Sequence, residues 1–289
     1  MKDTVLITGA TSFIAQHIVK LLNNDYTLKF LTRNPKDANH YAWDIASNTI
    51  DEKALDDVQH IIHLAGAKLN DGTPLTAARK QIVRASRIDG ATLILNNLKR
   101  KNQSIKTFIS ASALGYYAFD DKTLEITEDG NKGYGFAAQL SDDWEKAADL
   151  FQSEAIAERV VKLRVSLVLG NEGGIYKDFK QQLHHHPSKF KIASGTTYFP
   201  WVHVEDMAAM FVFAIHNRNM AGVYNTTAPF PTYQETMFNK MYALYSDDMK
   251  EFNKSSIEFN GQYLSSKKIQ NVGFTFKYQT IESALLNLK

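Results

Sequence analysis

Apolar positions at the start of the chain change from a continuous run to a helical spacing. Residues 5–7 are apolar and are closed by Thr8 and Gly9, after which apolar side chains recur at helical spacing from Ile14 to Leu22. This change of period predicts a strand, a tight turn and a helix.

Strand-like and helical patterns continue to alternate through the first part of the chain. β-Prone runs occupy residues 26–32, 58–64, 105–111 and 159–169, and helical patterns cover residues 75–99 and 136–151. Parallel strands need long crossover connections, and helices of this length supply them. The sequence therefore predicts an α/β fold built on a doubly wound parallel sheet.

The remainder of the chain is less regular. A helix is predicted at residues 205–216, a short strand at residues 222–227, and a further helix that begins at a capping box of Thr232 and Glu235. Another short helix is predicted to end at Gly273, since glycine favours the turn that closes a helix.

Composition narrows the classes of partner. Lys and Arg number 33 against 31 Asp and Glu, so no strong field favours nucleic acid or anionic membrane. The chain has no cysteine, which excludes thiol nucleophiles and thiolate metal sites. No signal-peptide pattern opens the sequence, and the longest apolar stretch, residues 207–215, is too short to span a bilayer. We expect a cytoplasmic protein with a small-molecule partner, without metal, nucleic acid or membrane.

The first predicted turn carries a depleted form of a dinucleotide-binding loop. Such a loop uses three glycines, for the tight turn, for close approach of a pyrophosphate and for packing of helix on strand. Here those places hold Gly9, Ser12 and Ala15. Ala15 is tolerable, whereas the Ser12 side chain narrows the phosphate space, although its hydroxyl could donate to a phosphate. An ordinary strand-to-helix turn stays open as the alternative.

The end of the second predicted strand bears on the choice of cofactor. An enzyme that uses NAD would carry a carboxylate there for the ribose 2′-hydroxyl, but this chain has Leu31, Thr32 and Arg33. A guanidinium suits a 2′-phosphate, so NADP is favoured over NAD. The alternative is that Arg33 is simply exposed to solvent.

Several motifs together resemble a known superfamily. They are "HLAGA" at residues 63–67, "ISASALGYY" at 109–117, "DDWEKAA" at 142–148, "NEGG" at 171–174, "FPWVHVEDM" at 199–207, "YNTTAP" at 224–229 and "GFTFKY" at 273–278. With Gly9 they resemble the extended short-chain dehydrogenase/reductase superfamily, and within it the atypical branch of NAD(P)-dependent epimerase family proteins with a small C-terminal region. The resemblance covers nearly the whole chain.

The resemblance implies a Rossmann domain of residues 1–170 and 200–228, and a small α+β substrate region of residues 171–199 and 229–289. It places the following residues at the cofactor: Gly9, Thr11, Ser12, Phe13 and Ile14 at the pyrophosphate, Arg33 at the adenosine ribose, Asp44 at the adenine, and Leu64, Ala65 and Gly66 beneath the cofactor. For Asp44 a surface carboxylate is the alternative. Residues 246–262 form a short polar segment where the branch has an additional apolar helix. This departure puts in doubt any substrate inferred from the branch, including nucleotide sugars.

The superfamily's catalytic residues are only partly present. A serine that orients the substrate matches Ser112, but the tyrosine and lysine places of the Tyr-x-x-x-Lys pair hold Ala137 and Ser141. That pair normally exchanges a proton while hydride moves, because the ammonium lowers the pKa of the phenol. Tyr116, with its neighbour Tyr117, is the candidate replacement, and Glu128 is a further candidate acid. The alternatives are a serine that closes a strand, a packed aromatic side chain and a loop carboxylate.

These observations predict an NADP-binding, short-chain dehydrogenase/reductase-like protein. Its chemistry would be that of a nucleoside-diphosphate-sugar epimerase or oxidoreductase, acting on an unidentified carbonyl or hydroxyl substrate. The competing hypothesis is a non-catalytic protein that senses NADP(H) or serves as a scaffold. A third is a vestigial fold in which Ser12 closes the cofactor site.

Overall fold

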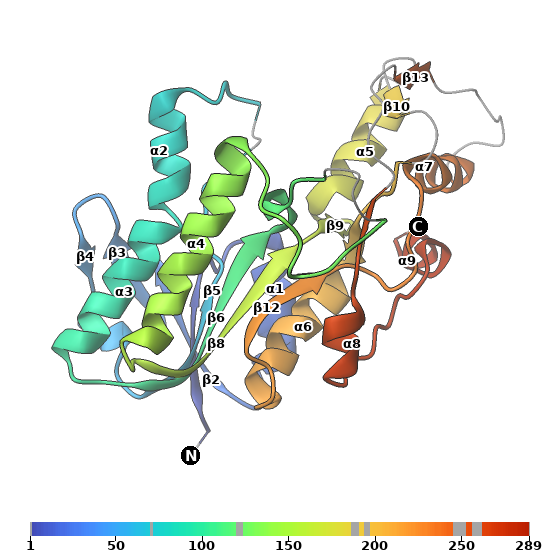
Figure 1. Ribbon diagram of the computed structural model, residues 1–289. Helices are drawn as coiled ribbons and strands as arrows, with labels where there is room; N and C mark the ends of the chain where they lie inside the picture. Colours follow the sequence, from blue (N-terminus) through green and yellow to red (C-terminus); the bar gives the residue numbers. More distant parts are fainter. Residues whose placement is uncertain are drawn as a thin grey trace. The chain divides into compact units, whose positions relative to one another are not determined.

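The computed structural model describes residues 2–69, 72–119, 124–185, 191–193, 197–244, 253–255 and 262–288. The chain folds into two compact units (Figure 1). The first unit consists of Met1–Tyr116, Lys132–Arg164 and Ala208–Val223, and the second of Tyr117–Asn131, Val165–Met207 and Tyr224–Lys289.

An eight-stranded, mostly parallel sheet forms the main layer. Its strands, in spatial order, are β12 (Gly222–Thr226), β8 (Ala157–Val165), β6 (Ile105–Ala113), β5 (Val58–His63), β1 (Thr4–Thr8), β2 (Thr27–Thr32), β3 (His40–Asp44) and β4 (Thr49–Ile50). Strand β1 pairs in parallel with β2 on one side and β5 on the other, and β3 pairs with β4 in the antiparallel sense. The predicted doubly wound α/β fold is confirmed.

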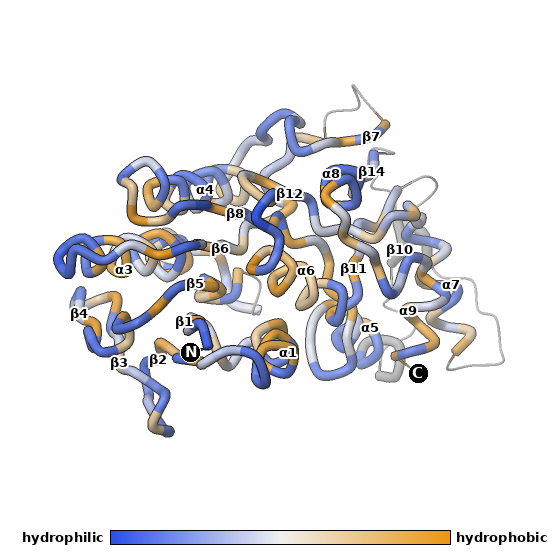
Figure 2. Tube along the Cα trace, turned by 90° about the horizontal axis from the view of Figure 1, so that it is seen from below, coloured by the Kyte–Doolittle hydropathy of each residue, from blue (hydrophilic) through white to orange (hydrophobic). Residues whose placement is uncertain are grey.

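Helices cover both faces of this sheet. They are α1 (Phe13–Leu22), α2 (Ala77–Ala85), α3 (Ile88–Arg100), α4 (Gly135–Ser153) and α6 (Val204–His216), with short 3₁₀ turns η1 (Glu52–Ala54) and η2 (Leu114–Tyr116). Figures 1 and 2 show α3 and α4 on one face and α1 and α6 on the other. Successive side chains of β1 point to opposite faces of the sheet, and all five residues of the strand are buried.

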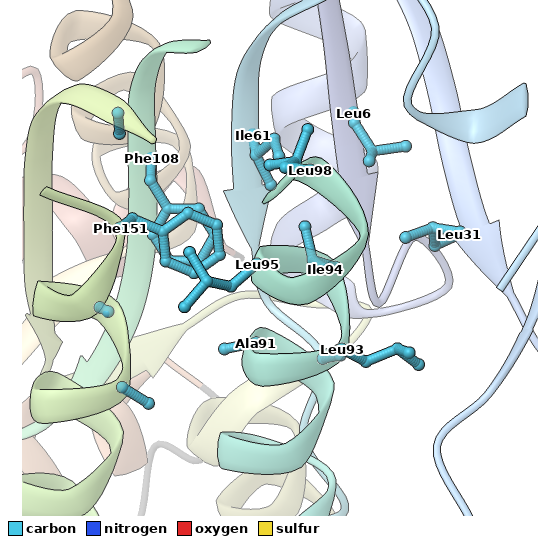
Figure 3. Close-up of a cluster of buried hydrophobic side chains, with 14 of the residues drawn as sticks. Leu6, Leu31, Ile61, Ala91, Leu93, Ile94, Leu95, Leu98, Phe108 and Phe151 are labelled. Carbon is cyan, nitrogen blue, oxygen red and sulfur yellow. The ribbon is translucent and has the colours of Figure 1, made fainter. Parts of the chain in front are cut away.

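The core of the first unit lies between the sheet and helices α3 and α4. The rings of Phe108 on β6 and Phe151 on α4 stack with centroids 3.6 Å apart and an interplanar angle of 13°. Figure 3 shows Leu95 of α3 beside them, and Ile94 of α3 and Leu6 of β1 further along the same buried cluster. Burial of these apolar side chains stabilises the layer by about 1.5–3 kcal/mol for each large residue.

The second unit contains the less regular part of the chain. Its elements are β7 (Glu125–Ile126), β9 (Leu167–Leu169), α5 (Gly174–His185), β10 (Lys191–Ala193), β11 (Trp201–His203), α7 (Gln234–Ala243), β13 (Asn253–Ser255), β14 (Tyr263–Leu264), α8 (Lys267–Asn271) and α9 (Ile281–Asn287). Short parallel pairs join β9 to β11, β14 to β7 and β10 to β13. A core around Tyr176, Trp201 and Phe238 holds the unit together.

Hydrogen bonds join two of the sequence motifs within the second unit. The carboxylate of Asp206, in "FPWVHVEDM", accepts hydrogen bonds from the backbone N–H groups of Lys277 and Tyr278 at 2.7 and 2.9 Å. Glu205 accepts a further bond from the Lys277 ammonium at 2.7 Å. The two motifs therefore have a structural role, since they fasten the C-terminal segment to the unit.

Two predicted elements are each divided in the structure. The helical pattern of residues 75–99 is broken into α2 and α3, because the Ser86 hydroxyl accepts from the Ala67 amide and donates to the Val83 carbonyl at the junction. The strand of residues 159–169 is two strands, β8 and β9.

The predicted capping box at Thr232 is wrong. The Thr232 hydroxyl accepts from the Trp201 indole N–H at 3.2 Å and donates to the Phe230 carbonyl, and α7 begins after Tyr233 without a side-chain cap. The predicted end at Gly273 is confirmed, with φ +98° just beyond α8. Of the polar segment 246–262, only β13 and Gln262 fall within the described residues. In the described part of the chain, no helix is both long and apolar enough to cross a membrane.

Candidate functional site

The strand order reverses at β1 and β5. The chain moves from β1 outward through β2 and β3, and then returns to β5 on the opposite side of β1. In open parallel sheets, ligands bind where the order reverses, outside the carboxyl ends of the strands. The predicted cofactor residues Gly9–Ile14 and Leu64–Gly66 follow these two strands, so the fold brings them to one edge.

Gly9 makes the turn out of β1 in a conformation that requires glycine. Its φ is +69°, and a Cβ there would lie 2.9 Å from the carbonyl carbon and oxygen of Leu64 and 3.0 Å from the Ala65 nitrogen. The hydroxyl of Thr8 fixes the same loop by accepting from the Leu64 and Ala65 amides at 3.1 and 3.0 Å. The two loops therefore touch through their backbones.

Ser12 is the N-cap of α1. Its Oγ accepts from the Ala15 amide at 3.2 Å, and its own amide donates to the Gly9 carbonyl at 2.9 Å. The amides of Thr11, Phe13 and Ile14 find no acceptor among the described residues. Because the Ser12 oxygen acts as an acceptor, its hydrogen stays available to donate, and three further N–H donors lie at the positive end of the helix dipole.

The third glycine position of the loop is filled by Ala15, which is fully buried. Helix α1 still packs there with a methyl group in place of a hydrogen. The sequence prediction that alanine is tolerated at this contact agrees with that packing.

Arg33 and Asp44 lie at the carboxyl ends of β2 and β3. Arg33 is exposed and makes no ion pair with any described residue. Asp44 is also exposed, and its Oδ1 accepts from the Ala46 amide at 2.9 Å in the turn between β3 and β4. Hydrogen bonds from Ser47 and the Ala46 amide lower the pKa of Asp44. The carboxylate thus supports the β3–β4 turn, which is the surface role left open by the sequence.

His63, the last residue of β5, is buried within a hydrogen-bond chain. Its Nδ1 lies 3.0 Å from the Thr8 hydroxyl, and its Nε2 lies 2.9 Å from the Arg87 carbonyl. A carbonyl only accepts, so Nε2 carries the proton and Nδ1 accepts from Thr8. Desolvation lowers the pKa of His63 from 6.5 to about 4, so the ring is neutral at physiological pH.

We expect acid to destabilise the protein through His63. The folded-state pKa of about 4 lies below the unfolded value of 6.5, so the stabilisation is complete above pH 6.5 and is lost as the pH falls toward 4. The free energy of unfolding should fall by about 3 kcal/mol from this group over that range. Urea titrations of the wild type and of His63→Gln at several pH values measure it.

The control for this experiment is His216→Gln, because His216 is exposed at the end of α6. That variant should keep the pH dependence of the wild type, whereas His63→Gln should flatten it between pH 6.5 and 4. Parallel stability curves for the wild type and His63→Gln would contradict the assignment.

The predicted catalytic serine is part of a buried ion-pair network. The Ser112 hydroxyl donates to Glu145 Oε1 at 2.6 Å, and Arg164 donates to Oε1 at 2.7 Å through Nε and to Oε2 at 2.9 Å through Nη2. All three side chains are buried. The guanidinium Cζ of Arg164 also lies 3.6 Å from the ring centroid of Tyr116, so the two predicted catalytic residues are linked through the pair of Glu145 and Arg164.

The tyrosine and lysine places of the missing pair hold Ala137 and Ser141, which pack against η2. Ser141 Oγ donates back to the Ala137 carbonyl at 2.9 Å. A Cβ on Gly115, in η2, would lie 3.4 Å from Ala137 Cβ and 4.0 Å from Ser141 Oγ. Small side chains therefore allow η2 to lie against α4 at this point.

The alternative acids Tyr117 and Glu128 lie in the second unit and are bound to Asn225. The Tyr117 hydroxyl donates to Asn225 Oδ1 at 2.6 Å, and Glu128 Oε1 accepts from the Asn225 amide at 2.8 Å. The Asn225 side-chain amide in turn donates to the carbonyls of Ile126 and Ser265. Both residues are thus bound to β12 through Asn225.

Sequence reasoning did not identify Glu145, Arg164 or Arg87. A signal was present for the first two: Glu145 falls on the same face of the predicted helix as Ala138, Ser141 and Ala148, and Arg164 interrupts an apolar strand. A carboxylate and a guanidinium, each at a position that should be buried, indicate a buried pair. Arg87 lies inside a pattern that predicts one continuous helix.

Comparisons with known proteins agree with this architecture. The family model described as NAD dependent epimerase/dehydratase family matches residues 5–226. An epimerase family protein of Staphylococcus aureus (strain MRSA252) is 29% identical over 301 residues, covering 98% of each chain. An epimerase family protein of Staphylococcus haemolyticus is 27% identical with the same coverage.

Solved structures show the same fold. A human epimerase family protein, solved with NADPH, superposes with a TM-score of 0.81 at 21% identity, covering 99% of this chain and 98% of that one. A UDP-N-acetylglucosamine 4-epimerase from Bacillus cereus gives a TM-score of 0.79 at 18% identity, with 99% of both chains covered. The superfamily resemblance drawn from the motifs is confirmed.

Proposed function

The chain belongs to the NAD-dependent epimerase/dehydratase family, within the extended short-chain dehydrogenases/reductases, and on this premise we propose that it binds NADP(H). Its activity would be that of an epimerase or oxidoreductase on a carbonyl or hydroxyl substrate of the nucleoside-diphosphate-sugar kind. Two structural neighbours support this direction: the Bacillus cereus protein is a UDP-N-acetylglucosamine 4-epimerase, and the human protein was solved with NADPH.

The turn from Gly9 to Ile14 is the observation that carries this proposal. Close backbone contact at Gly9 and the unpaired amides of Thr11, Phe13 and Ile14, among the described residues, fit a diphosphate at a helix N-terminus. Ser12 adds a hydroxyl donor, because its oxygen is bonded to Ala15. The nicotinamide cofactor, when bound, supplies hydride exchange with the substrate.

Arg33 is proposed to select NADPH over NADH. Arg33→Ala should weaken NADPH binding about tenfold or more, since a guanidinium to phosphate contact contributes at least about 1.4 kcal/mol. NADH binding should change little, because NADH has no 2′-phosphate. Calorimetric titration of both dinucleotides into the wild type and the variant measures the difference.

Lys36→Ala, which removes an exposed cation in the same loop, is the control and should leave both affinities near the wild-type values. Equal affinity of the wild type for NADPH and NADH would remove the role of Arg33. No binding of either at millimolar concentration would remove the proposed function.

On the substrate side, Ser112 would orient the reacting oxygen and Tyr116 would exchange its proton. Tyr116 lies just after the end of β6 in the same unit as Ser112, against the Arg164 guanidinium.

A second candidate function, binding of NADP(H) without turnover, is favoured by a specific observation. The Ser112 hydroxyl is bonded to a buried carboxylate, and the usual proton-transfer pair is replaced by Ala137 and Ser141. Oxidation of NADPH by a panel of carbonyl compounds separates the two.

A further inference from the structure

Arg87 is a largely buried cation that has no counter-ion among the described residues. It lies at the junction of α2 and α3, and it forms no ion pair with a carboxylate in the described part of the chain. Burial, and to a lesser extent the charge of Arg79, lowers the pKa of Arg87 to about 10, so the guanidinium stays charged at neutral pH. A buried charge is costly unless it is paired, so this cation requires an explanation.

One edge of the guanidinium is held by the protein. Nη1 donates to the carbonyl oxygens of Ala67 and Val83, both at 3.0 Å. The face of the group lies against Gly66, where a Cβ would come within 2.9 Å of Cζ and 3.0 Å of Nη2. The backbone carbonyl of Arg87 is fixed separately by His63. These contacts fix the orientation of the group.

The other edge has no acceptor among the described residues. Nε is buried and makes no hydrogen bond there, and Nη2 donates to none of these residues either. Nε–H and the neighbouring Nη2–H are parallel donors, the arrangement that binds both oxygens of a carboxylate or two oxygens of a phosphate. The edge formed by Nε and Nη2 therefore presents two parallel N–H donors that have no acceptor among the described residues.

A second unpartnered donor belongs to the same cluster. The ring of Trp144, on α4, lies 4.9 Å from Arg87 Cζ. Trp144 is 6% exposed, and its indole Nε1 is buried without a hydrogen-bond partner among the described residues. Buried N–H groups of this kind are rare in folded proteins, and here one belongs to the Arg87 cation and one lies beside it, so an acceptor that carries negative charge fits the cluster.

We propose that Arg87 and Trp144 form a binding site for an oxyanion, a carboxylate or phosphate group, beside the loop that follows β5. The site is formed by other residues than the helix N-terminus at Gly9, and inorganic phosphate tests it without the proposed dinucleotide. Gly66 is part of it, because any side chain there would displace the guanidinium. The oxyanion could belong to a substrate or to the cofactor.

Indole N–H resonances test this in the wild-type protein. The chain has three tryptophans, and Trp144→Phe identifies the resonance of Trp144. Titration with inorganic phosphate or acetate should move this resonance saturably. Arg87→Lys should weaken the phosphate affinity about tenfold or more, because an ammonium cannot donate two parallel bonds. Absence of any movement with phosphate, acetate and NADPH would overturn the proposal.

Arg84→Met is the matched control, since Arg84 is an exposed arginine of α2 that pairs with Asp143. It should leave the phosphate titration unchanged; an equal loss in both arginine variants would mean general charge attraction and would refute the site. Adding phosphate to protein saturated with NADPH tests whether the bound oxyanion belongs to the cofactor or to a separate molecule. A phosphate shift that persists assigns the site to a separate oxyanion, and one that is abolished assigns it to the cofactor. Failure of NADPH binding leaves the phosphate titration readable.

Discussion

Replacing Glu145 by glutamine is expected to lower the free energy of unfolding by about 3–5 kcal/mol, because the change removes the carboxylate that pairs with the buried Arg164 guanidinium. Glu145 accepts two bonds from Arg164 and one from Ser112, all at 2.9 Å or less, in a site closed to solvent. Glutamine keeps the shape but loses the charge and one acceptor. Urea unfolding followed by circular dichroism measures the loss.

Glu52→Gln is the matched control, because Glu52 pairs with Arg100 at 2.7 Å with both side chains more than half exposed. Its effect should stay within about 1 kcal/mol. The double variant Glu145→Leu with Arg164→Met should recover most of the stability, since it removes both buried charges together. A loss from Glu145→Gln as small as that from Glu52→Gln would show that the buried pair does not stabilise the fold.

Gly9→Ala is expected to abolish NADPH binding and to destabilise the protein by about 3 kcal/mol or more. Part of the cost, about 1–2 kcal/mol, comes from the positive φ. The remainder comes from the new methyl group, which would lie 2.9 Å from the Leu64 carbonyl and force apart the two loops at the carboxyl ends of β1 and β5. Thermal unfolding and calorimetric titration with NADPH measure the two effects.

Gly222→Ala separates the two causes. Gly222 has φ +79°, close to the value at Gly9, but an added Cβ would meet no atom within 4 Å. This variant should lose only the conformational part of the stability and should bind NADPH as the wild type does. Wild-type affinity in a folded Gly9→Ala protein would show that the cofactor does not use this turn.

The main sheet could be predicted from the sequence because its central strands carry short buried apolar runs. In β1, β5 and β6 these runs are residues 5–7, 61–62 and 108–109, and all of them are buried. Strand β3 escaped prediction because only Trp43 among its five residues is buried. The break between α2 and α3 was missed for a different reason, since it depends on contacts of Ser86 with a loop distant in sequence.

The candidate site was predictable only in part. The turn at Gly9 has a local signature, because its conformation is set by the residues next to it. For the network of Ser112, Glu145 and Arg164 the sequence indicates only that a carboxylate and a guanidinium are buried. Which side chains meet is set by the fold, since the network joins a strand, a helix and a second strand. The cluster of Arg87, Gly66 and Trp144 likewise has no local signature, because the fold brings these residues together from separate segments.

The two units are interleaved along the chain, with three segments in each. The polypeptide passes from one to the other after Tyr116, Asn131, Arg164, Met207 and Val223. No single cut therefore releases either half intact, and a shortened fragment would lack strands or helices needed by its own core. The ribosome must synthesise the chain as far as Val223 before every segment of the first unit is present. The first unit can therefore be completed only late in translation.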